Sequence, residues 1–174
     1  MKINVWQIII DHLDTLRNDV SKRISFVDVL TFFIFPILCS ILGYLACVKV
    51  SKDFYNVSIT FFGVFVALLL NFQVAAFGIY NRKWSLSEDE KLSLNQVEKI
   101  GIRRRLLKET NANISYLILF SALSILFFVI LYTVEKTTRM AGFVSLFIYI
   151  HFVLTLLMVV KRSHALFRKE YDET

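Results

Sequence analysis

The sequence has 174 residues, of which 56% are hydrophobic and 20% are charged, and its mean hydropathy is +0.60. One Pro and five Gly leave no room for a low-complexity linker. A net charge of +6 would suggest a nucleic-acid partner for a soluble protein, but long uncharged stretches indicate a membrane protein, in which basic residues serve first as an insertion signal.

The N-terminal segment, residues 1–28, is of mixed charge, and residues 4–24 predict an amphipathic helix in it. Apolar residues recur there at spacings of three and four: Trp6, Ile9, Leu13, Leu16, Val20 and Ile24. We expect this helix to lie on the inner leaflet or against the cytosolic ends of the spans, with Trp6 near the headgroups. Packing or membrane seeking is the favoured role, and partner binding is the alternative.

Four stretches without Asp, Glu, Lys or Arg follow: residues 29–48, 54–81, 110–134 and 140–160. Crossing the hydrocarbon of a bilayer takes roughly 20 apolar residues in a helix. Because lipid offers the backbone no hydrogen-bond partner, helices are expected for such stretches. The sequence therefore predicts an all-α polytopic membrane protein with four transmembrane helices in two hairpins, residues 29–81 and 110–160.

The links within the two hairpins are short, 49–53 and 135–139, so spans one and two, and spans three and four, are expected to be antiparallel neighbours. Pro36 lies in the first span, where it removes a backbone hydrogen bond and can kink the helix. Neighbouring helices often repair such a defect. A gating role for this kink is the less favoured interpretation.

The second span carries small residues at four-residue spacing. They are Gly63, Ala67, Asn71 and Ala75, with Gly78 three residues further on. Such a stripe forms a groove that lets another helix approach closely, within or between subunits. Asn71 can add a hydrogen bond across the groove, contributing on the order of 1 kcal/mol.

Three further polar residues predict a polar core in the membrane: Gln73 in span two, and His151 and Thr155 in span four. His151 and Thr155 are one turn apart and share a face, whereas Gln73 faces away from Asn71. Hydrogen bonds between helices are the favoured role of these residues, and a pore or sensing cavity is the alternative. Proton sensing would need a titrating partner, and no carboxylate occurs in any span.

Residues 82–109 form a basic insert between spans two and three. Ser87 to Glu90 resemble a capping box, and the helix that begins there is expected to pass through Gly101 into span three. An unbroken helix from Glu88 to Val134 would project about 30 Å from the membrane. The cations nearest the inner leaflet are Arg103, Arg104, Arg105 and Lys108. Lipid headgroups are their favoured partners, and a protein surface is the alternative.

The distribution of Lys and Arg predicts the orientation. Residues 1–28 hold four, 82–109 eight and 161–174 four, against two each in 49–53 and 135–139. Short loops rich in Lys and Arg stay in the cytoplasm, so both termini and the insert are expected inside. The tail, residues 161–174, is expected to be cytosolic, as a helix extension or a frayed end.

The motifs of common enzyme classes are missing from the sequence: there is no P-loop, no H-E-x-x-H, no G-x-S-x-G and no Gly-rich dinucleotide turn. Carboxylates lie only outside the spans, without metal-ligand spacing. We therefore expect no catalytic residues, no metal and no cofactor, and we expect membrane lipids rather than nucleic acid to be the direct ligands.

The order of these features resembles a known type of protein along the whole chain, through the amphipathic segment Val5–Ile24, the four spans and the basic insert Lys83–Lys108. Its architecture is similar to that of the membrane subunits of bacterial antiphage defence systems, in particular the Kiwa system. The resemblance implies a homo-oligomer, a tetramer, in the bacterial inner membrane. It also implies that the subunit detects phage attachment or injection and acts with a cytosolic DNA-binding partner protein.

Two functions are open from the sequence. The first is a non-enzymatic sensor and scaffold that oligomerises in the membrane and recruits a cytosolic effector, as the insert and the amphipathic helix suggest. The second is a triggered pore that depolarises the membrane, as Pro36, Asn71, Gln73 and His151 suggest. The scarcity of charge inside the membrane favours the first.

Overall fold

The computed structural model describes residues 4–16, 26–80, 90–134 and 138–171, and every regular element in these ranges is a helix. Four of the helices are long and apolar enough to cross a membrane. The predicted all-α fold with four membrane helices is therefore confirmed.

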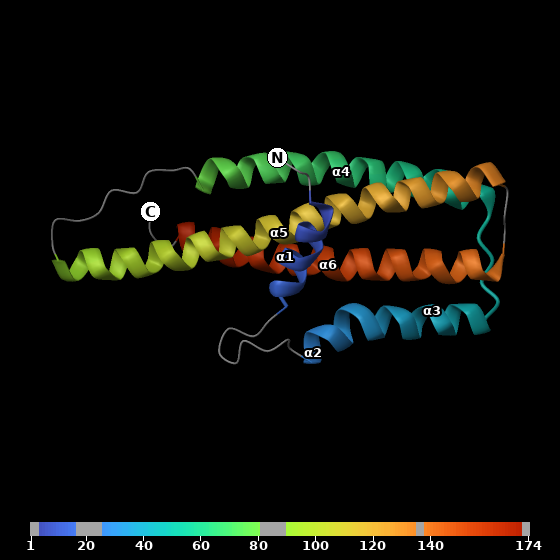
Figure 1. Ribbon diagram of the computed structural model, residues 1–174, viewed down its shortest axis with the longest axis horizontal. Coiled ribbons are helices and arrows are strands. Elements are labelled where there is room, and N and C mark those ends of the chain that lie inside the picture. The colour runs from blue at the N-terminus through green and yellow to red at the C-terminus, as the bar shows by residue number, and fades with distance from the viewer. Residues whose placement is uncertain (1–3, 17–25, 81–89, 135–137, 172–174) are drawn as a thin grey trace.

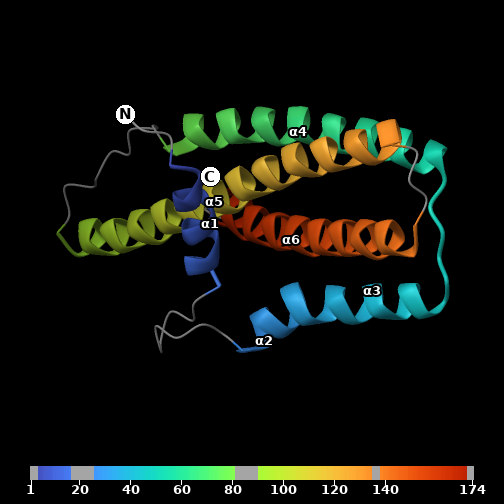
Figure 2. The ribbon, with the colours of Figure 1, turned by 45° about the vertical axis from the view of Figure 1, so that its right-hand side comes forward.

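The N-terminal helix, α1 (Val5–Asp14), is shorter than the predicted amphipathic segment. Residues 17–25, to which that prediction extended, lie outside the described residues. In Figures 1 and 2, α1 lies across the bundle and packs against α5. The first helix is thus short and lies against the bundle.

The first span is built from three consecutive helical pieces: α2 (Phe26–Val29), the π-helix η1 (Leu30–Ile34) and α3 (Phe35–Leu45). Pro36 stands in the first turn of α3, directly after the π-helix. A π turn is one of the ways in which a helix accommodates a disturbed hydrogen-bond ladder. The helix disturbance predicted at Pro36 is therefore this π-helical turn. The helical span runs from Phe26 to Leu45, so it lies closer to the N-terminus than the predicted residues 29–48.

The other three spans are single long helices, α4 (Lys52–Tyr80), α5 (Glu90–Val134) and α6 (Arg139–Tyr171). From Glu90 onwards, the insert and span three form one helix that passes through Gly101 without a break, as predicted. The C-terminal tail extends α6 as far as Tyr171, which agrees with the first of the two predicted alternatives, a helix extension. Ser87 and the rest of the proposed capping box up to residue 89 lie outside the described residues.

The helices pack in the order α4, α5, α6, α3, each antiparallel to the next (Figures 1 and 2). The prediction that spans one and two are neighbours is wrong, because α3 packs against α6 and α4 packs against α5. Residues 46–51 can extend over roughly 20 Å at 3.3 Å per residue, about two helix-to-helix distances, so the link does not force adjacency. The predicted pairing of spans three and four, α5 with α6, is confirmed.

Aromatic rings join α4, α5 and α6. Phe62, Phe128 and Phe152, one from each helix, are fully buried. The Phe62 ring stacks with Phe128 at a centroid distance of 5.9 Å and meets Phe152 edge-on at 5.1 Å. Such pairs contribute about 0.5–1.5 kcal/mol each beyond the area that they bury. Because lipid is as apolar as these side chains, helix association in a membrane depends on contacts of this kind.

Two glycines allow α3 and α6 to approach each other. A methyl group added at Gly142 would lie 2.6 Å from the backbone oxygen of Val48, and one added at Gly43 would lie 2.7 Å from Leu146 Cδ2. Cys47, at φ 55°, ends α3 in the left-handed conformation, and the Val48 N–H donates to the Gly43 carbonyl over 3.1 Å. This Schellman-type ending turns the chain across Gly142.

Candidate functional site

α1 is docked on α5 through a histidine. His12 is 1% exposed, and its Nδ1 lies 2.8 Å from Asn113 Oδ1. Because an amide oxygen only accepts, this nitrogen carries the proton and donates. The imidazole also stacks on the Tyr116 ring, with centroids 3.9 Å apart and planes within 3° of parallel. Because a buried polar ring needs a hydrogen-bond partner, the contact of His12 with Asn113 fixes the position of α1 on the bundle.

The C-terminal end of α1 is held by further contacts. Thr15 Oγ1 lies 2.8 Å from Asn113 Oδ1, and the Thr15 carbonyl accepts a hydrogen bond of 2.7 Å from Arg162 Nη2 on α6. The same guanidinium lies 3.8 Å from the Glu109 carboxylate, which also pairs with Arg105 at 3.0 Å. The last carbonyls of a helix carry partial negative charge, so a cation there stabilises the docked helix.

Tyr116 connects α1 to the interior of the bundle. While its ring stacks on His12, its hydroxyl lies 2.8 Å from His151 Nε2 on α6. His151 Nδ1 in turn lies 2.9 Å from the backbone oxygen of Phe32 in η1. The carbonyl can only accept, so Nδ1 carries a proton and donates. Nε2 is paired with the tyrosine hydroxyl, so both ring nitrogens of His151 have a partner.

The carbonyl that His151 binds lies four residues before Pro36, so in α-helical register the proline leaves it without a donor. In an α-helix the oxygen of residue 32 accepts from the N–H of residue 36, and a proline has no N–H. His151 supplies the missing donor from a neighbouring helix, a repair that membrane bundles commonly use. Thr155 donates to the His151 carbonyl over 2.9 Å. The proline and the histidine are thus one structural unit.

These contacts form a continuous path from α1 through α5 and α6 to the first span. We call it the α1 network, defined as His12, Thr15, Asn113, Tyr116, His151 and the Phe32 carbonyl.

The electrostatics of the α1 network favour a neutral His12. Burial lowers the pKa of His12 to about 4, because desolvation disfavours the imidazolium. The hydrogen bond with Asn113 opposes this shift, and the nearby His151 and Arg162 add to it. His12 Nε2 and Asn113 Nδ2 are buried without a hydrogen-bond partner among the described residues. Docking of α1 therefore depends on a neutral His12 imidazole. It also leaves these two buried nitrogen atoms without a hydrogen bond, which is unfavourable.

The predicted polar core divides into two separate places. Gln73 Nε2 donates to Asn111 Oδ1 over 3.1 Å and to Ser115 Oγ over 3.0 Å, between α4 and α5. His151 and Thr155 are buried in the α1 network, so the structure brings these two together but not with Gln73. All three side chains make hydrogen bonds within the protomer.

The two glycines of the small-residue stripe of α4 make no close helix contact within the described part of the protomer. A methyl group added at Gly63 or Gly78 would meet no described atom within 4 Å. Gly63 is half-buried, and the remaining members are exposed: Ala67, Asn71, Ala75 and Gly78. The stripe is open to a second chain, and its role in oligomers remains a prediction.

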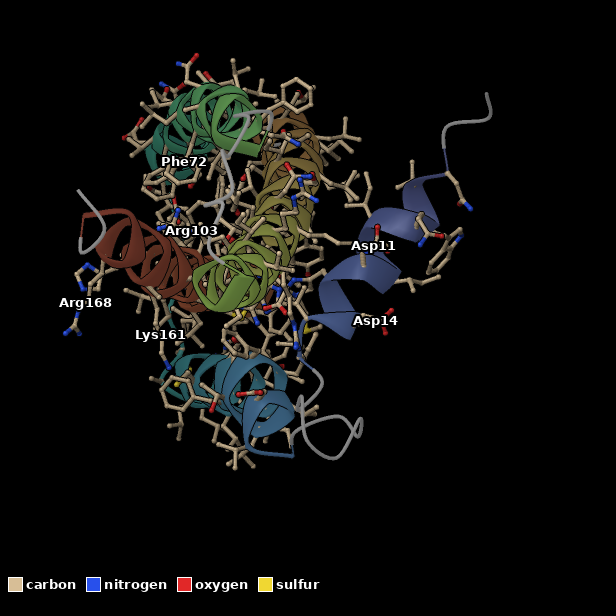
Figure 3. All side chains as sticks on the ribbon, turned by 90° about the vertical axis from the view of Figure 1, so that its left-hand side faces the viewer. Asp11, Asp14, Phe72, Arg103, Lys161 and Arg168 are labelled. Carbon is tan, nitrogen blue, oxygen red and sulfur yellow. The ribbon has the colours of Figure 1, made fainter. Side chains whose placement is uncertain are left out.

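The basic cluster at the start of span three does not form one surface. Arg103 is 4% exposed and lies between α4 and α6 (Figure 3), whereas Arg104, Arg105 and Lys108 are exposed. Arg105 is paired with Glu109. Successive helix residues point about 100° apart, which explains the division.

Sequence reasoning missed His12, Asn113 and Tyr116. The last two stand at a spacing of three and so share one face of span three, which could have marked a polar contact there. Their partner His12 is 101 residues from Asn113 along the chain. In α1 itself, Trp6 and Leu13 of the predicted apolar face are exposed and His12 is buried. Leu16, which also belongs to that face, is buried just after the end of α1.

No protein-family model, curated protein or solved structure matches the chain. Among the described residues, no group of three His, Cys, Asp or Glu side chains is placed to hold a metal ion.

Proposed function

We propose that this chain is a non-enzymatic sensor and scaffold of the bacterial inner membrane, which recruits a soluble partner at its cytosolic face. The observation that carries this proposal is α5, one helix from Glu90 to Val134 that runs past the ends of α4 and α6 (Figure 1). From Lys108 to Glu90 it advances about 27 Å at 1.5 Å per residue. A bundle that only needed stability in lipid has no use for this projection, whereas a recruiting protein does.

The α1 network supports the sensing half of the proposal. It joins a helix outside the spans to the first span and to α6 through contacts of 2.8 to 2.9 Å. A change in the packing of η1 against α6 would alter the hydrogen bonds of His151 and, through Tyr116, the surface on which His12 is stacked. Two sites are coupled when both bias the same element, and here that element is the docked α1.

The partner and the assembly are proposed by resemblance. Like the membrane subunits of the Kiwa system, the chain would assemble as a homo-oligomer, respond to phage at the membrane and act with a cytosolic DNA-binding protein. The open stripe from Gly63 to Gly78 supports a contact between subunits. Both termini and the projecting part of α5 would face the cytosol, as the Lys and Arg distribution predicts.

A triggered pore is less well supported. Two of the residues that suggested it, Gln73 and His151, make hydrogen bonds to neighbouring helices within the protomer. Side chains whose donors and acceptors are already engaged are poorly suited to line a water-filled path. Asn71 is exposed, but it lies on the stripe that we assign to a subunit contact.

Recovery of a soluble protein encoded beside this chain tests the proposal. Lys91→Glu with Lys99→Glu changes the projecting part of α5 without touching Arg103 or Arg105, which belong to the bundle. We expect the partner to be lost from the purified complex while membrane insertion is unchanged. Lys49→Glu with Arg139→Glu, at the other end of the bundle, makes the same charge change and should retain the partner. Full recovery of the partner with the α5 variant would contradict recruitment by this helix.

A further inference from the structure

A cavity of about 520 Å³ lies between the C-terminal part of α4 and the middle of α5. Its volume falls within the roughly 300–1,000 Å³ that is usual for small-molecule sites. The apolar part of its lining is Ala76, Phe77 and Leu107, and the cationic part is Arg104, Arg105 and Lys108. One side of the cavity therefore suits a hydrocarbon chain and the other suits an anion.

The charge of this cavity distinguishes it from the adjacent one. The second cavity, of about 410 Å³ between α1 and α5, combines Arg105 and Lys108 with the carboxylates of Asp11, Asp14 and Glu109. No carboxylate is among the described residues that line the first cavity. Within the described part of the chain Arg105 is paired with Glu109, whereas Arg104 and Lys108 have no ion pair. Two cations thus remain to bind an anion.

The position of the cavity along the membrane helices indicates which kind of anion it binds. The Gln73 to Asn111 hydrogen bond lies within the apolar part of α4, in the uncharged stretch that runs to residue 81. The cationic side chains of α5 begin one turn beyond this bond, towards the projecting end of the helix, where phospholipid headgroups are expected. Phe77 is 65% exposed and Val74 73% exposed, so the adjoining face of α4 is open to acyl chains. A soluble anion would gain nothing from this apolar wall.

We propose that this cavity binds one anionic phospholipid, with the phosphate between Arg104 and Lys108 and an acyl chain along Ala76, Phe77 and Leu107. Basic pockets between transmembrane helices on the cytoplasmic side are known to take anionic headgroups. The proposal names a ligand for the membrane part of the molecule, and it holds whether or not α5 recruits a partner.

Lipid titration of the full chain in detergent, followed by native mass spectrometry, tests the site with two lipids of identical acyl chains. We expect phosphatidylglycerol to bind more tightly than phosphatidylcholine. Arg104→Gln with Lys108→Gln should lower the affinity for phosphatidylglycerol roughly 20- to 30-fold, since each cation near an anionic headgroup contributes about five-fold. The affinity for phosphatidylcholine should change little. Equal affinity of the variant and the parent for phosphatidylglycerol would overturn the proposal.

Lys161→Gln with Arg168→Gln is the matched control, because Figure 3 shows both residues on the side of the bundle opposite α1. This variant loses the same charge and should keep the preference for phosphatidylglycerol. An equal loss in both variants would mean diffuse attraction to the surface and would overturn a defined site.

Two further measurements separate the lipid from other anions. Phe77→Asn, at an exposed position, should weaken phosphatidylglycerol binding several-fold, because it removes apolar contact with the acyl chain. Inorganic phosphate should fail to compete at concentrations similar to those of the lipid, and effective competition would show a soluble-anion site instead. Lost recovery of a soluble partner with unchanged lipid binding in the Arg104 and Lys108 variant would assign the cavity to a protein, against the proposal.

Discussion

The buried residue of α1 is His12, and it attaches this helix to α5. Its ring is buried, stacked on Tyr116 and hydrogen-bonded to Asn113, while Trp6 stays 71% exposed. A buried imidazole lowers the free energy of docking only while it is neutral, because imidazolium would have to leave water. One residue therefore makes the docking of α1 sensitive to pH.

Docking of α1 should weaken as the pH falls. The pKa of His12 is lowered to about 4 when docked, against about 6.5 in a free chain, so protons favour the undocked state. The stabilisation is complete above pH 6.5 and declines towards pH 4, by about 2 kcal/mol at pH 5. The mobility of a spin label at the exposed position 10, measured in lipid nanodiscs from pH 7.5 to 5, reports it. His12→Gln should remove this pH dependence, and a parent chain without one would contradict the assignment.

Gly142 should not tolerate even a methyl group. Gly142→Ala places the new atom 2.6 Å from the Val48 carbonyl oxygen, and such overpacking costs about 1–3 kcal/mol. Thermal stability in detergent should fall accordingly. Gly101→Ala is the matched control, because no described atom lies within 4 Å of the added methyl group and this glycine is not part of the stripe, so its stability should not fall. Equal stability of the two variants would refute the close approach of α3 to α6.

At the scale of elements, the first span and α6 form one unit through Pro36 and His151. The π-helix before the proline and the histidine that binds the Phe32 carbonyl are two parts of the same repair. A carbonyl without a donor is unfavourable in a bilayer, so this repair helps to hold the first span against α6. It also explains a lone histidine in the membrane without any titrating partner.

The two residues should be energetically coupled. His151→Phe removes the donor to the Phe32 carbonyl and is costly while Pro36 is present. Pro36→Ala restores an N–H at position 36, so the same histidine substitution should then cost about 0.6–1 kcal/mol less. The other effects of His151→Phe, including loss of the tyrosine contact, cancel in a double-mutant cycle on unfolding free energies. If His151→Phe lowers the unfolding free energy equally with and without Pro36→Ala, the histidine does not compensate for the proline.

The sequence predicted the helices well because their signal is local. Uncharged stretches of about 20 residues locate each span, and nothing near Gly101 breaks the helix that runs through it. The packing order was not predictable from the link at 46–51, since six extended residues reach either a neighbour or the helix beyond it. Long-range side-chain partners leave no local signal: His151 was singled out, but its contacts with Tyr116 and the Phe32 carbonyl were not.

For the whole molecule, the distribution of Lys and Arg predicts both ends of the chain inside the cell. Single-cysteine variants at Lys52, Lys136 and Ser93, made without the native cysteines, test this orientation. A membrane-impermeant thiol reagent should label positions 52 and 136 from outside and position 93 only after the membrane is opened. Labelling of position 93 from outside would reverse the molecule and place the proposed recruiting helix in the wrong compartment.

The proposed sensor requires that a change in the packing of the spans alters the position of α1. His151 is inside the bundle and does not hydrogen-bond to α1, yet it holds the Tyr116 ring on which His12 is stacked. Tyr116 is therefore one route by which a change in the first span or in α6 can reach α1, beside the direct contact of Arg162 with the Thr15 carbonyl. This coupling is the central claim, and it can be measured without knowing the stimulus.

The most direct measurement is the distance between spin labels at Ile10 on α1 and Ala122 on α5, in sparsely labelled protein in nanodiscs. The parent chain should give one narrow distribution, and Asn113→Leu, which removes the direct contact, should broaden it. His151→Phe should broaden it as well, although it changes no atom that touches the α1 backbone. Gln73→Leu, which removes an interhelical hydrogen bond away from the α1 network, should leave the distribution narrow. A narrow distribution in His151→Phe beside a broad one in Asn113→Leu would show that α1 docks locally and is not coupled to the spans.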